Sequence, residues 1–296
     1  MAAGRRLHTR SGELANYLRA ESADEAVGIL ARGGWTVVAG CTDYYCSPSS
    51  RPLADDVLDV TGLADARGIA DAQDHWRLGA LTTWSEIAGS NDLPELFSAL
   101  RHAARQIGGV QIQNAGTIGG NLCNASPAAD GVPPLLAMDA AVELRSATGM
   151  RVLPLADFIR GNRRTALQAG ELLTAILIPK RIARTASVFV KLGARAYQLI
   201  SIVMVAVVIE ADAEDQVSTA AVAVGACSTV AQRLPELEMA LIGRSLAGPP
   251  LSTALTARHL GALSPVSDVR ATAQYRRDAA ATLVRRALDT AQDRLR

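Results

Sequence analysis

Two short stretches, rich in glycine and small polar residues, hold the groups that could do chemistry. The first runs from Ala39 to Asp43 after a short apolar run, and the second runs from Gly116 to Asp130. Glycines let a backbone turn sharply and let other atoms approach closely, because no Cβ stands in the way. Exposed N–H groups in such a turn form a concave site for anions. Each stretch is a candidate cradle for a phosphate-bearing cofactor, and an ordinary loop dense in turn formers is the alternative.

Polar side chains add further binding groups to the second stretch. Thr117, Asn121 and Asn124 supply side-chain donors and acceptors, and Asp130 ends the stretch with a carboxylate. Ser126-Pro127 resembles the start of a helix, a capping serine followed by proline. Asp130 is therefore open to a second interpretation, as an acid in the first turn of a helix.

The overall composition argues against several classes of function. Lysine and arginine number 30 and aspartate and glutamate 29, so the formal net charge is +1. A charge so close to zero favours neither a nucleic-acid partner nor a membrane surface. Aromatic residues make up 4% of the chain, which also speaks against base-stacking platforms. The hydrophobic fraction of 49% indicates a globular protein.

The cysteines and histidines form no metal-binding pattern in the sequence. Four cysteines stand at positions 41, 46, 123 and 227, none in a Cys-x-x-Cys pair, and the four histidines are scattered. We therefore expect reduced, buried thiols and no zinc or iron–sulfur site. The N-terminus lacks an apolar signal core, and the longest apolar run, Leu199 to Ile209, is too short to span a bilayer. These features predict a soluble, cytoplasmic protein.

Apolar spacing and capping residues predict the elements around the two stretches. Ser22, with Glu25 three residues later, predicts a capping box at the start of a helix over 22–34. A strand over 35–39 leads into the first stretch and can pair with a strand over 57–60. Further strands are expected over 75–80, 141–144, 150–152 and 172–178, and helices over 84–89 (capped by Thr82 or Thr83), over 94–107 and from Pro133.

The rest of the chain shows strands followed by helices. Strands are expected over 187–193, 199–210 and 217–224, and helices over 236–243, 251–262 and 268–294. This segregation is typical of an α+β fold. A charged break at 179–186 marks a domain boundary, and a lesser division lies at 60–70. We therefore expect three units, at 1–62, 63–180 and 181–296.

The order of these motifs resembles a known family. Ala39-Gly-Cys-Thr-Asp43, followed by Thr117-Ile-Gly-Gly-Asn121 and Asn124-Ala-Ser-Pro-Ala-Ala-Asp130, is similar to the FAD-binding subunit of molybdenum hydroxylases. These enzymes include xanthine dehydrogenases and aerobic carbon monoxide dehydrogenases. The resemblance continues through Phe189-Val-Lys-Leu-Gly193 and through Ser267-Asp-Val-Arg270 with Tyr275-Arg276. It therefore covers nearly the whole chain.

The resemblance implies both a fold and an activity. The fold is a two-part FAD-binding domain of the PCMH type, followed by a C-terminal α/β domain with a three-stranded antiparallel sheet and a helical bundle. The enzyme is an oxidoreductase in which this medium subunit holds FAD and contributes no catalytic residue and no metal ligand. The partners are a large molybdopterin subunit and a small subunit with 2Fe–2S clusters, in a dimer of heterotrimers. Electrons would pass from the clusters through FAD to NAD⁺, oxygen, a quinone or another carrier.

The resemblance also implies roles for single residues. Two loops would clasp the FAD diphosphate through backbone N–H groups, and Asp130 would accept hydrogen bonds from the ribityl chain or ring edge. Leu173 and Lys191 would lie near the isoalloxazine ring, with a core leucine and a solvated strand lysine as the ordinary alternatives. The cofactor-binding loop residues are Ala39, Gly40, Cys41, Thr42 and Asp43, then Thr117, Ile118, Gly119, Gly120, Asn121 and Asn124.

Three positions depart from the family pattern. The second glycine of the first loop is Cys41, so the backbone there must avoid a positive φ or adopt one at some cost. Gln113 replaces an arginine often found before the second loop. Ile107 replaces an aromatic residue that stacks on the flavin in some relatives. Tyr275 and Arg276 are expected to serve packing or subunit contact.

Two other functions stay open at this point. A stand-alone FAD-dependent oxidoreductase would bind its own substrate, although a second nucleotide fingerprint is lacking. A scaffold subunit that has lost its cofactor is the other possibility, and Cys41 is the change that raises it. A yellow monomer that turns over a soluble substrate would favour the first, and freshly purified protein without flavin would favour the second.

Overall fold

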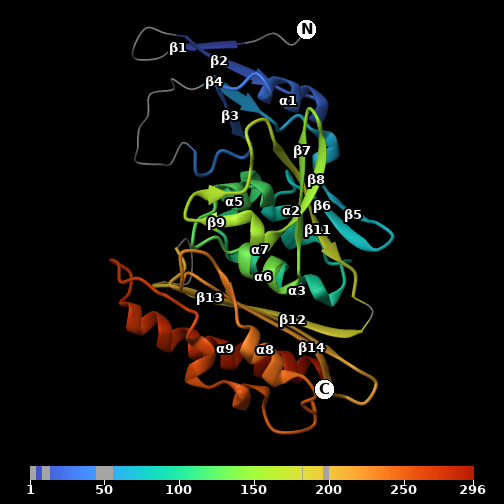
Figure 1. Cartoon of the computed structure of the whole chain (residues 1–296), viewed down its shortest axis with the longest axis vertical. Helices are drawn as coiled ribbons and strands as arrows, with labels where there is room; N and C mark the ends of the chain where they lie inside the picture. Colours follow the sequence, from blue (N-terminus) through green and yellow to red (C-terminus); the bar gives the residue numbers. More distant parts are fainter. Residues whose placement is uncertain (1–4, 9–13, 45–55, 182, 196–199) are drawn as a thin grey trace.

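The computed structural model describes residues 5–8, 14–44, 56–181, 183–195 and 200–296. Three layers follow one another along the long axis of the molecule (Figure 1). A small N-terminal sheet comes first, a central sheet with short helices second, and a C-terminal sheet backed by a long helix third. Cys46 and the first residue of the strand expected over 199–210 lie outside the described residues.

The N-terminal layer is a four-stranded sheet in the order β1-β2-β4-β3. Its elements are β1 (Arg5–His8), β2 (Leu14–Arg19), α1 (Ala23–Leu30), β3 (Trp35–Val38) and β4 (Asp56–Asp59). β3 pairs in parallel with β4, which confirms the expected pairing. Ser22 caps α1 by accepting a bond from the Glu25 N–H at 3.2 Å, but the Glu25 carboxylate accepts from the Glu21 N–H at 2.9 Å. The predicted capping box is therefore wrong, because the Glu25 carboxylate binds the N–H of Glu21 instead of the N–H of the cap residue, Ser22.

The central layer is a five-stranded antiparallel sheet in the order β5-β6-β11-β7-β8. Its strands are β5 (Ile69–Asp71), β6 (His75–Gly79), β7 (Ala141–Ser146), β8 (Gly149–Pro154) and β11 (Leu172–Pro179). A 3₁₀ turn η1 (Ala64–Ala66) precedes it. A small hairpin of β9 (Ile159–Gly161) and β10 (Arg164–Thr165) lies beside the sheet. The strands expected over 75–80, 141–144, 150–152 and 172–178 are confirmed as β6, β7, β8 and β11.

Short helices cover this central sheet. They are α2 (Trp84–Gly89), the 3₁₀ turn η2 (Glu95–Phe97), α3 (Ser98–Gln106), α4 (Val110–Ala115), α5 (Ile118–Asn124), α6 (Val132–Ala137) and α7 (Leu155–Phe158). Thr83 caps α2 and both bonds of a capping box form there. Ser126 and Pro127 begin no helix, because the chain turns through 126–131 before α6.

The C-terminal layer is an antiparallel sheet in the order β12-β13-β14-β15. Its elements are β12 (Arg184–Leu192), β13 (Val203–Ala211), β14 (Val217–Gly225), β15 (Gln232–Arg233), α8 (Pro235–Leu241), the 3₁₀ turns η3 (Leu251–Ala254) and η4 (Ala257–Leu260), and α9 (Ala273–Leu295). The structure contains the three expected strands and a fourth, the short β15. The helix expected over 251–262 is replaced by η3 and η4. α9 begins later than expected because the Asp268 side chain accepts the N–H groups of Arg270 and Ala271 in a turn.

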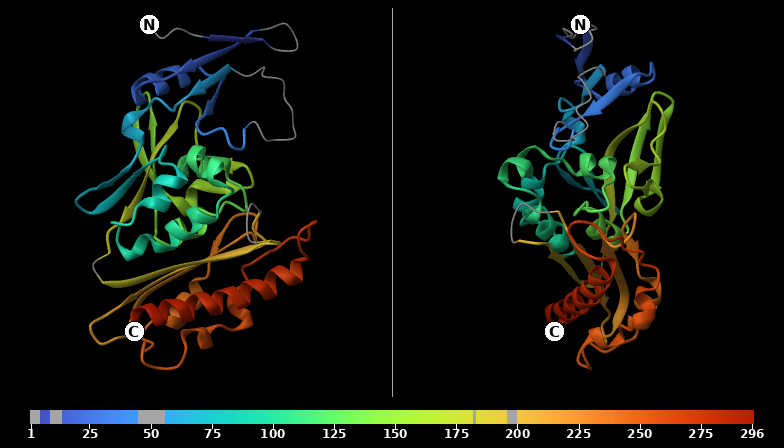
Figure 2. Two further views of the ribbon diagram at one scale, coloured as in Figure 1. Left: turned by 180° about the vertical axis from the view of Figure 1, so that it is seen from behind. Right: turned by 90° about the vertical axis from the view of Figure 1, so that its left-hand side faces the viewer.

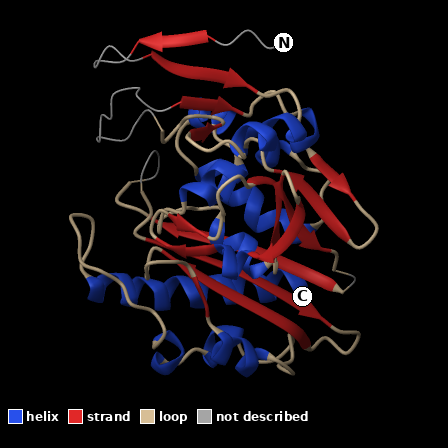
Figure 3. Cartoon of the chain, turned by 45° about the horizontal axis from the view of Figure 1, so that its top comes forward, coloured by secondary structure: helices blue, strands red, loops and turns tan. Residues whose placement is uncertain are grey.

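Strand β13 explains how the last two layers join. Its residues alternate between two apolar clusters: Met204, Ala206 and Val208 face the central layer, whereas Val203, Val205, Val207 and Ile209 face α9. Every residue of β13 is buried, which accounts for its unbroken apolar run. Figure 2 shows the C-terminal sheet between the central layer and α9. Figure 3 shows helices on both sides of its long strands.

Candidate functional site

The structure brings the two predicted loops into contact. The first, Ala39–Asp43, leaves the end of β3 and is called loop 1 here. The second begins at Gly116, and its next residue, Thr117, caps α5. A Cβ on Gly40 would lie 1.7 Å from the Ala115 carbonyl oxygen, and one on Gly116 would lie 3.4 Å from Thr42 Oγ1. Gly40 therefore allows a backbone approach that a larger residue would block.

The second stretch is the first turn of a helix rather than a loop. Thr117 Oγ1 accepts the Gly120 N–H at 3.1 Å, and the Thr117 carbonyl accepts the Asn121 N–H at 3.0 Å. The N–H groups of Ile118 and Gly119 donate to the carbonyls of Thr82 and Ala80, at 3.0 and 2.8 Å. These four donors are already used within the protein, so the row of anion-binding N–H groups expected here is not available.

The adjacent glycines of this turn have different surroundings. A Cβ on Gly119 would lie 2.7 Å from the Cβ and carbonyl oxygen of Ala80, so this glycine is required by packing. A Cβ on Gly120 would meet Thr117 Oγ1 at 2.9 Å and, among the described residues outside its chain neighbours and its own helix backbone, no other atom within 4 Å. Gly120 is therefore the glycine of the pair with space beside it.

Loop 1 supplies the free backbone donors. Within the described ranges, the N–H groups of Gly40, Cys41, Thr42 and Asp43 have no hydrogen-bond acceptor. Cys41 adopts a φ of 56°, so the departure from glycine is met by a left-handed cysteine rather than by a changed backbone. Successive N–H groups around such a turn can converge on an anion. The capacity to bind a diphosphate thus lies mainly in loop 1.

Arg163 links loop 1 to the far end of α5. This residue lies in the turn between β9 and β10, and its Nη1 donates to Asp43 Oδ2 at 2.5 Å and to Asn124 Oδ1. Sequence reasoning missed Arg163, because it lies 120 positions from Asp43. The basic pair Arg163-Arg164 in a turn was the one available signal.

Asn121 carries a buried atom that lacks a partner. Its Oδ1 is enclosed and accepts no hydrogen bond from the residues that the structure describes. Gly131 adjoins it, since a Cβ there would lie 2.9 Å from this oxygen and 2.6 Å from the Trp84 ring. Buried carbonyl oxygens normally have donors, so the Asn121 side chain fits a cofactor hydroxyl or N–H beside α5. The free N–H groups of loop 1 and the unpartnered Asn121 oxygen therefore fit the polar groups of FAD.

Asp130 and Lys191 form a buried ion pair at the junction of the central and C-terminal layers. Lys191 Nζ lies 2.5 Å from Asp130 Oδ2 and donates to the Gln106 carbonyl at 3.2 Å. Ser201 Oγ donates to Asp130 Oδ1 at 2.5 Å. The two charged side chains are 9% and 5% exposed, so the solvated-lysine interpretation of Lys191 was wrong. Asp130 also precedes α6 and is not an acid of its first turn.

The burial of this pair changes the pKa of its carboxyl group. Burial raises the pKa of Asp130 above its ordinary value, although the Lys191 ammonium and the Ser201 hydroxyl act in the opposite direction. Both oxygens of Asp130 already have donors from the protein. A cofactor hydroxyl or N–H would therefore share an oxygen with Lys191 or Ser201.

The remaining predicted positions lie nearby in the core. Leu173 of β11 is 5% exposed and belongs to the apolar cluster of the central layer. Ile107 ends α3 and packs against that cluster. The Gln113 side chain donates to the carbonyls of Arg105 and Ile107 at 3.2 and 3.0 Å, which ties α4 to α3. Gln113 therefore stabilises the turn before the site.

Arg276 and Tyr275 lie in different surroundings on α9. Arg276 is 3% exposed and donates to the Ile202 and Ala226 carbonyls at 2.6 and 3.1 Å and to Asp268 Oδ1 at 2.8 Å. Tyr275 is half exposed. Arg276 is thus packed in the interior, as expected. Its bond to the Ile202 carbonyl holds the chain between Ser201 and the start of β13.

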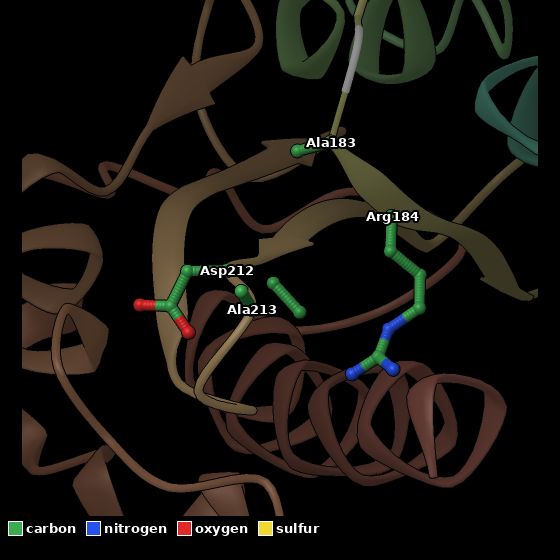
Figure 4. A pocket seen from close by; sticks show the side chains of 5 residues that line it. Ala183, Arg184, Asp212 and Ala213 are labelled. Atoms are coloured by element: carbon green, nitrogen blue, oxygen red, sulfur yellow. The ribbon is translucent and has the colours of Figure 1, made fainter.

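Other features of the described chain lie apart from this site. An open depression of about 600 Å³ is lined by Ala183, Arg184 and 211–213, at one edge of the C-terminal sheet (Figure 4). Arg184 pairs with Asp215 there. Among the described residues, no group of three or more His, Cys, Asp or Glu side chains is placed to hold a metal ion. None of the described helices combines the length and apolar character needed to cross a bilayer.

Comparison with known proteins identifies relatives of the whole chain. Residues 11–181 match the FAD binding domain in molybdopterin dehydrogenase, and residues 189–291 match the CO dehydrogenase flavoprotein C-terminal domain. The glyceraldehyde dehydrogenase medium chain of Sulfolobus acidocaldarius is 30% identical over 276 residues, which are 92% of this chain and 96% of that one. The carbon monoxide dehydrogenase medium chain of Afipia carboxidovorans is 27% identical over 288 residues, 94% and 97% of the two chains.

A solved structure has the same fold. The reconstituted CO dehydrogenase from Oligotropha carboxidovorans contains a chain that superposes with a TM-score of 0.87 at 27% identity, covering 94% of this chain and 97% of that one. This match confirms the predicted α+β fold with its FAD-binding and C-terminal parts. FAD is therefore the cofactor of this oxidoreductase subunit, and the chain belongs to the family of FAD-binding medium subunits of molybdopterin dehydrogenases.

Proposed function

We propose that this chain is the FAD-carrying electron-transfer subunit of a heterotrimeric molybdenum hydroxylase. Electrons would reach it from 2Fe–2S clusters of a small partner subunit and leave for an external acceptor such as NAD⁺, oxygen or a quinone. A large partner subunit would hold the molybdopterin and oxidise the organic substrate. The contact of loop 1 with Ala115 and Gly116 carries this proposal, because it places the free N–H groups of 40–43 against the chain that leads into α5, the helix with the unpartnered Asn121 oxygen.

Loop 1 and α5 would divide the binding of FAD between them. The N–H groups of Gly40 to Asp43 would bind the diphosphate, with Ala39 positioning the loop. Gly120 would leave room for the cofactor, while Thr117, Ile118 and Gly119 would hold α5 in place through their bonds to the central layer. Asn121 and Asn124 would contact the cofactor or its binding residues through their side chains.

Three residues would serve the flavin end of the site. Lys191 would provide a cation and Asp130 a hydrogen-bond acceptor, with Lys191 Nζ 2.5 Å from Asp130 Oδ2. Leu173 would contribute an apolar surface. FAD, when bound, accepts and passes on electrons. A nearby ammonium stabilises negative charge on a reduced flavin, although its pairing with Asp130 weakens that effect.

The assembly is part of the same proposal. The three units at 1–62, 63–180 and 181–296 would be the two FAD-binding subdomains and the C-terminal domain, and the whole would form a dimer of heterotrimers. A carbon monoxide dehydrogenase relative is described as a medium chain, which supports a multisubunit enzyme. Cys41, Cys123 and Cys227 are free thiols, which suits a cytoplasmic location.

Electron delivery by the complex tests this function. The chain would be purified with the proteins that accompany it, and the complex would be reduced with dithionite and mixed with each acceptor. We expect Gly120→Val to lose FAD, because its side chain would fill the space beside Gly120, and we expect the complex that contains it to keep reducible iron–sulfur clusters and to lose acceptor reduction. Equal acceptor reduction without FAD would contradict the proposal. Turnover of a substrate by the isolated yellow chain would instead favour a stand-alone oxidoreductase.

A further inference from the structure

Arg163 pairs with Asp43, the carboxylate of loop 1. Asp43 places a carboxylate beside the N–H groups proposed to bind a diphosphate, and its side chain is 50% exposed. A carboxylate next to a diphosphate would repel it, because like charges at short range raise the free energy of the complex. Arg163 Nη1 lies 2.5 Å from Asp43 Oδ2, so a cation already stands between this carboxylate and α5.

The backbone of the β9–β10 turn holds Arg163 in place. The Arg163 N–H donates to the Ala125 carbonyl at 3.0 Å, and α5 also contacts β10. Both Arg163 and Ala125 have left-handed backbones, with φ of 56° and 47°. Such conformations are unfavourable for residues other than glycine and are retained where the surrounding structure requires them. Figure 1 shows β9 next to α5.

The guanidinium of Arg163 retains unused donors. Asp43 and Asn124 both contact Nη1, and in the described part of the chain Nε and Nη2 have no acceptor. The Arg163 side chain is 55% exposed, so these donors are accessible. Arginine presents a planar fork of donors that suits phosphate oxygens.

We propose that Arg163 is the cation of the diphosphate subsite, oriented by Asp43 and Asn124. It neutralises Asp43 and directs its remaining N–H groups toward a phosphate oxygen of the cofactor. This inference rests on the proposed function, since it requires FAD at loop 1. The ligand chemistry is a dinucleotide diphosphate, and riboflavin, which has no phosphate, lacks the group that Arg163 recognises.

Flavin titrations of the chain freed of its cofactor test this assignment. Dissociation constants for FAD and for riboflavin would be measured for the wild type, Arg163→Gln, Arg163→Lys and Arg164→Gln. Arg164 is the matched control, because it is the exposed arginine next in the chain, at the start of β10, and no hydrogen bond or ion pair of its side chain is found among the described residues. Loss of a charge-assisted hydrogen bond predicts about tenfold weaker FAD binding for Arg163→Gln. Riboflavin binding should stay constant, Arg163→Lys should recover part of the loss, and Arg164→Gln should match the wild type.

Asp43→Asn separates recognition of the diphosphate from a purely structural bridge. Asparagine keeps an oxygen that accepts from Nη1 but removes the negative charge, so we expect tighter FAD binding. Higher salt should weaken FAD binding by the wild type more than binding by Arg163→Gln, since one charge contact is missing in the variant.

Each contrary result has a distinct meaning. Equal losses for FAD and riboflavin in Arg163→Gln, or weaker FAD binding by Asp43→Asn, would overturn the assignment in favour of a structural bridge. Unchanged FAD binding by Arg163→Gln would also overturn it. A wild-type chain that binds no FAD at all would instead contradict the proposed function. Far-ultraviolet circular dichroism of each variant confirms that it is folded before titration.

Discussion

Lys191 Nζ lies 2.5 Å from Asp130 Oδ2, and both side chains are nearly inaccessible to solvent. Lys191 comes from β12 of the C-terminal sheet, whereas Asp130 comes from the turn before α6 in the central layer. This ion pair thus joins the two layers beside the proposed flavin end of the site. Because the pair is buried, removal of either charge would leave the other charge buried without a partner.

Loss of one partner of this pair should destabilise the protein strongly. Lys191→Met and Asp130→Asn each disrupt the buried ion pair, and we expect losses of about 3–5 kcal/mol in the free energy of unfolding. The double variant Lys191→Met/Asp130→Asn should lose less than the sum of the two single losses. Urea unfolding of the FAD-free chain measures this. Additive losses in the double variant would mean that the pair is not coupled.

The two glycines of α5 should respond differently to substitution. Gly119→Ala places a Cβ 2.7 Å from Ala80, and such overpacking should cost about 1–3 kcal/mol. Gly120→Ala displaces the Thr117 hydroxyl but gains helix propensity, so its free energy of unfolding should change little. FAD binding should weaken in Gly120→Ala. Thermal unfolding and flavin titration compare the variants, and equal stability of both would contradict the assigned surroundings.

Cys41→Gly should relieve a local backbone cost. Cysteine at φ 56° costs about 1–2 kcal/mol, while glycine adopts this conformation freely. The greater freedom of glycine in the unfolded chain offsets part of the gain, so we expect stabilisation of at most about 1 kcal/mol. FAD affinity should be kept, because the loop conformation is unchanged. A lower midpoint of denaturation together with weaker FAD binding would show that the thiol itself is required.

The Asp268–Arg276 pair should give a pH-dependent contribution to stability. Burial alone raises the pKa of Asp268, but the N–H groups of Arg270 and Ala271 and the Arg276 guanidinium outweigh burial and hold this pKa well below its usual range. A depressed pKa contributes stability above the unfolded value of about 3.9, and that contribution is lost as the pH falls toward the folded value.

Stability measured against pH tests the sign of this effect. Asp268→Asn should be less stable than the wild type at pH 6, and the difference should shrink as the pH is lowered below about 4. Asp278→Asn, whose carboxylate accepts a hydrogen bond from Gln274 Nε2 at 2.9 Å, serves as a control on α9, the helix that carries Arg276. A constant difference across the pH range would contradict ionic pairing of Asp268.

The sequence predicted those parts of the fold that depend on local pattern. Runs of apolar residues located the three long strands of the C-terminal sheet, and Thr83 and Ser22 marked two helix starts. The pair Gly119-Gly120 was interpreted as a loop, because glycine disfavours helices. Tertiary bonds to Thr82 and Ala80 override that preference and form α5.

Contacts between distant residues were beyond the sequence pattern. Loop 1 and α5 were expected to cooperate only through the family resemblance, and the collision of a Cβ on Gly40 with Ala115 appears only in three dimensions. The same is true of the ion pair between Lys191 and Asp130, because solvation of Lys191 was the alternative to its expected place near the flavin, and no pairing was predicted.

Hydrogen exchange of the backbone tests the central claim, that FAD binds at loop 1 beside α5. Exchange measured by mass spectrometry would be compared for the FAD-free and FAD-saturated chain. The N–H groups of 40–43 lack acceptors within the described residues, so their exchange should slow strongly when FAD binds, whereas 118–121 should change little because their N–H groups are already bonded. Unaltered exchange over 40–43 in a chain that demonstrably holds FAD would contradict the account.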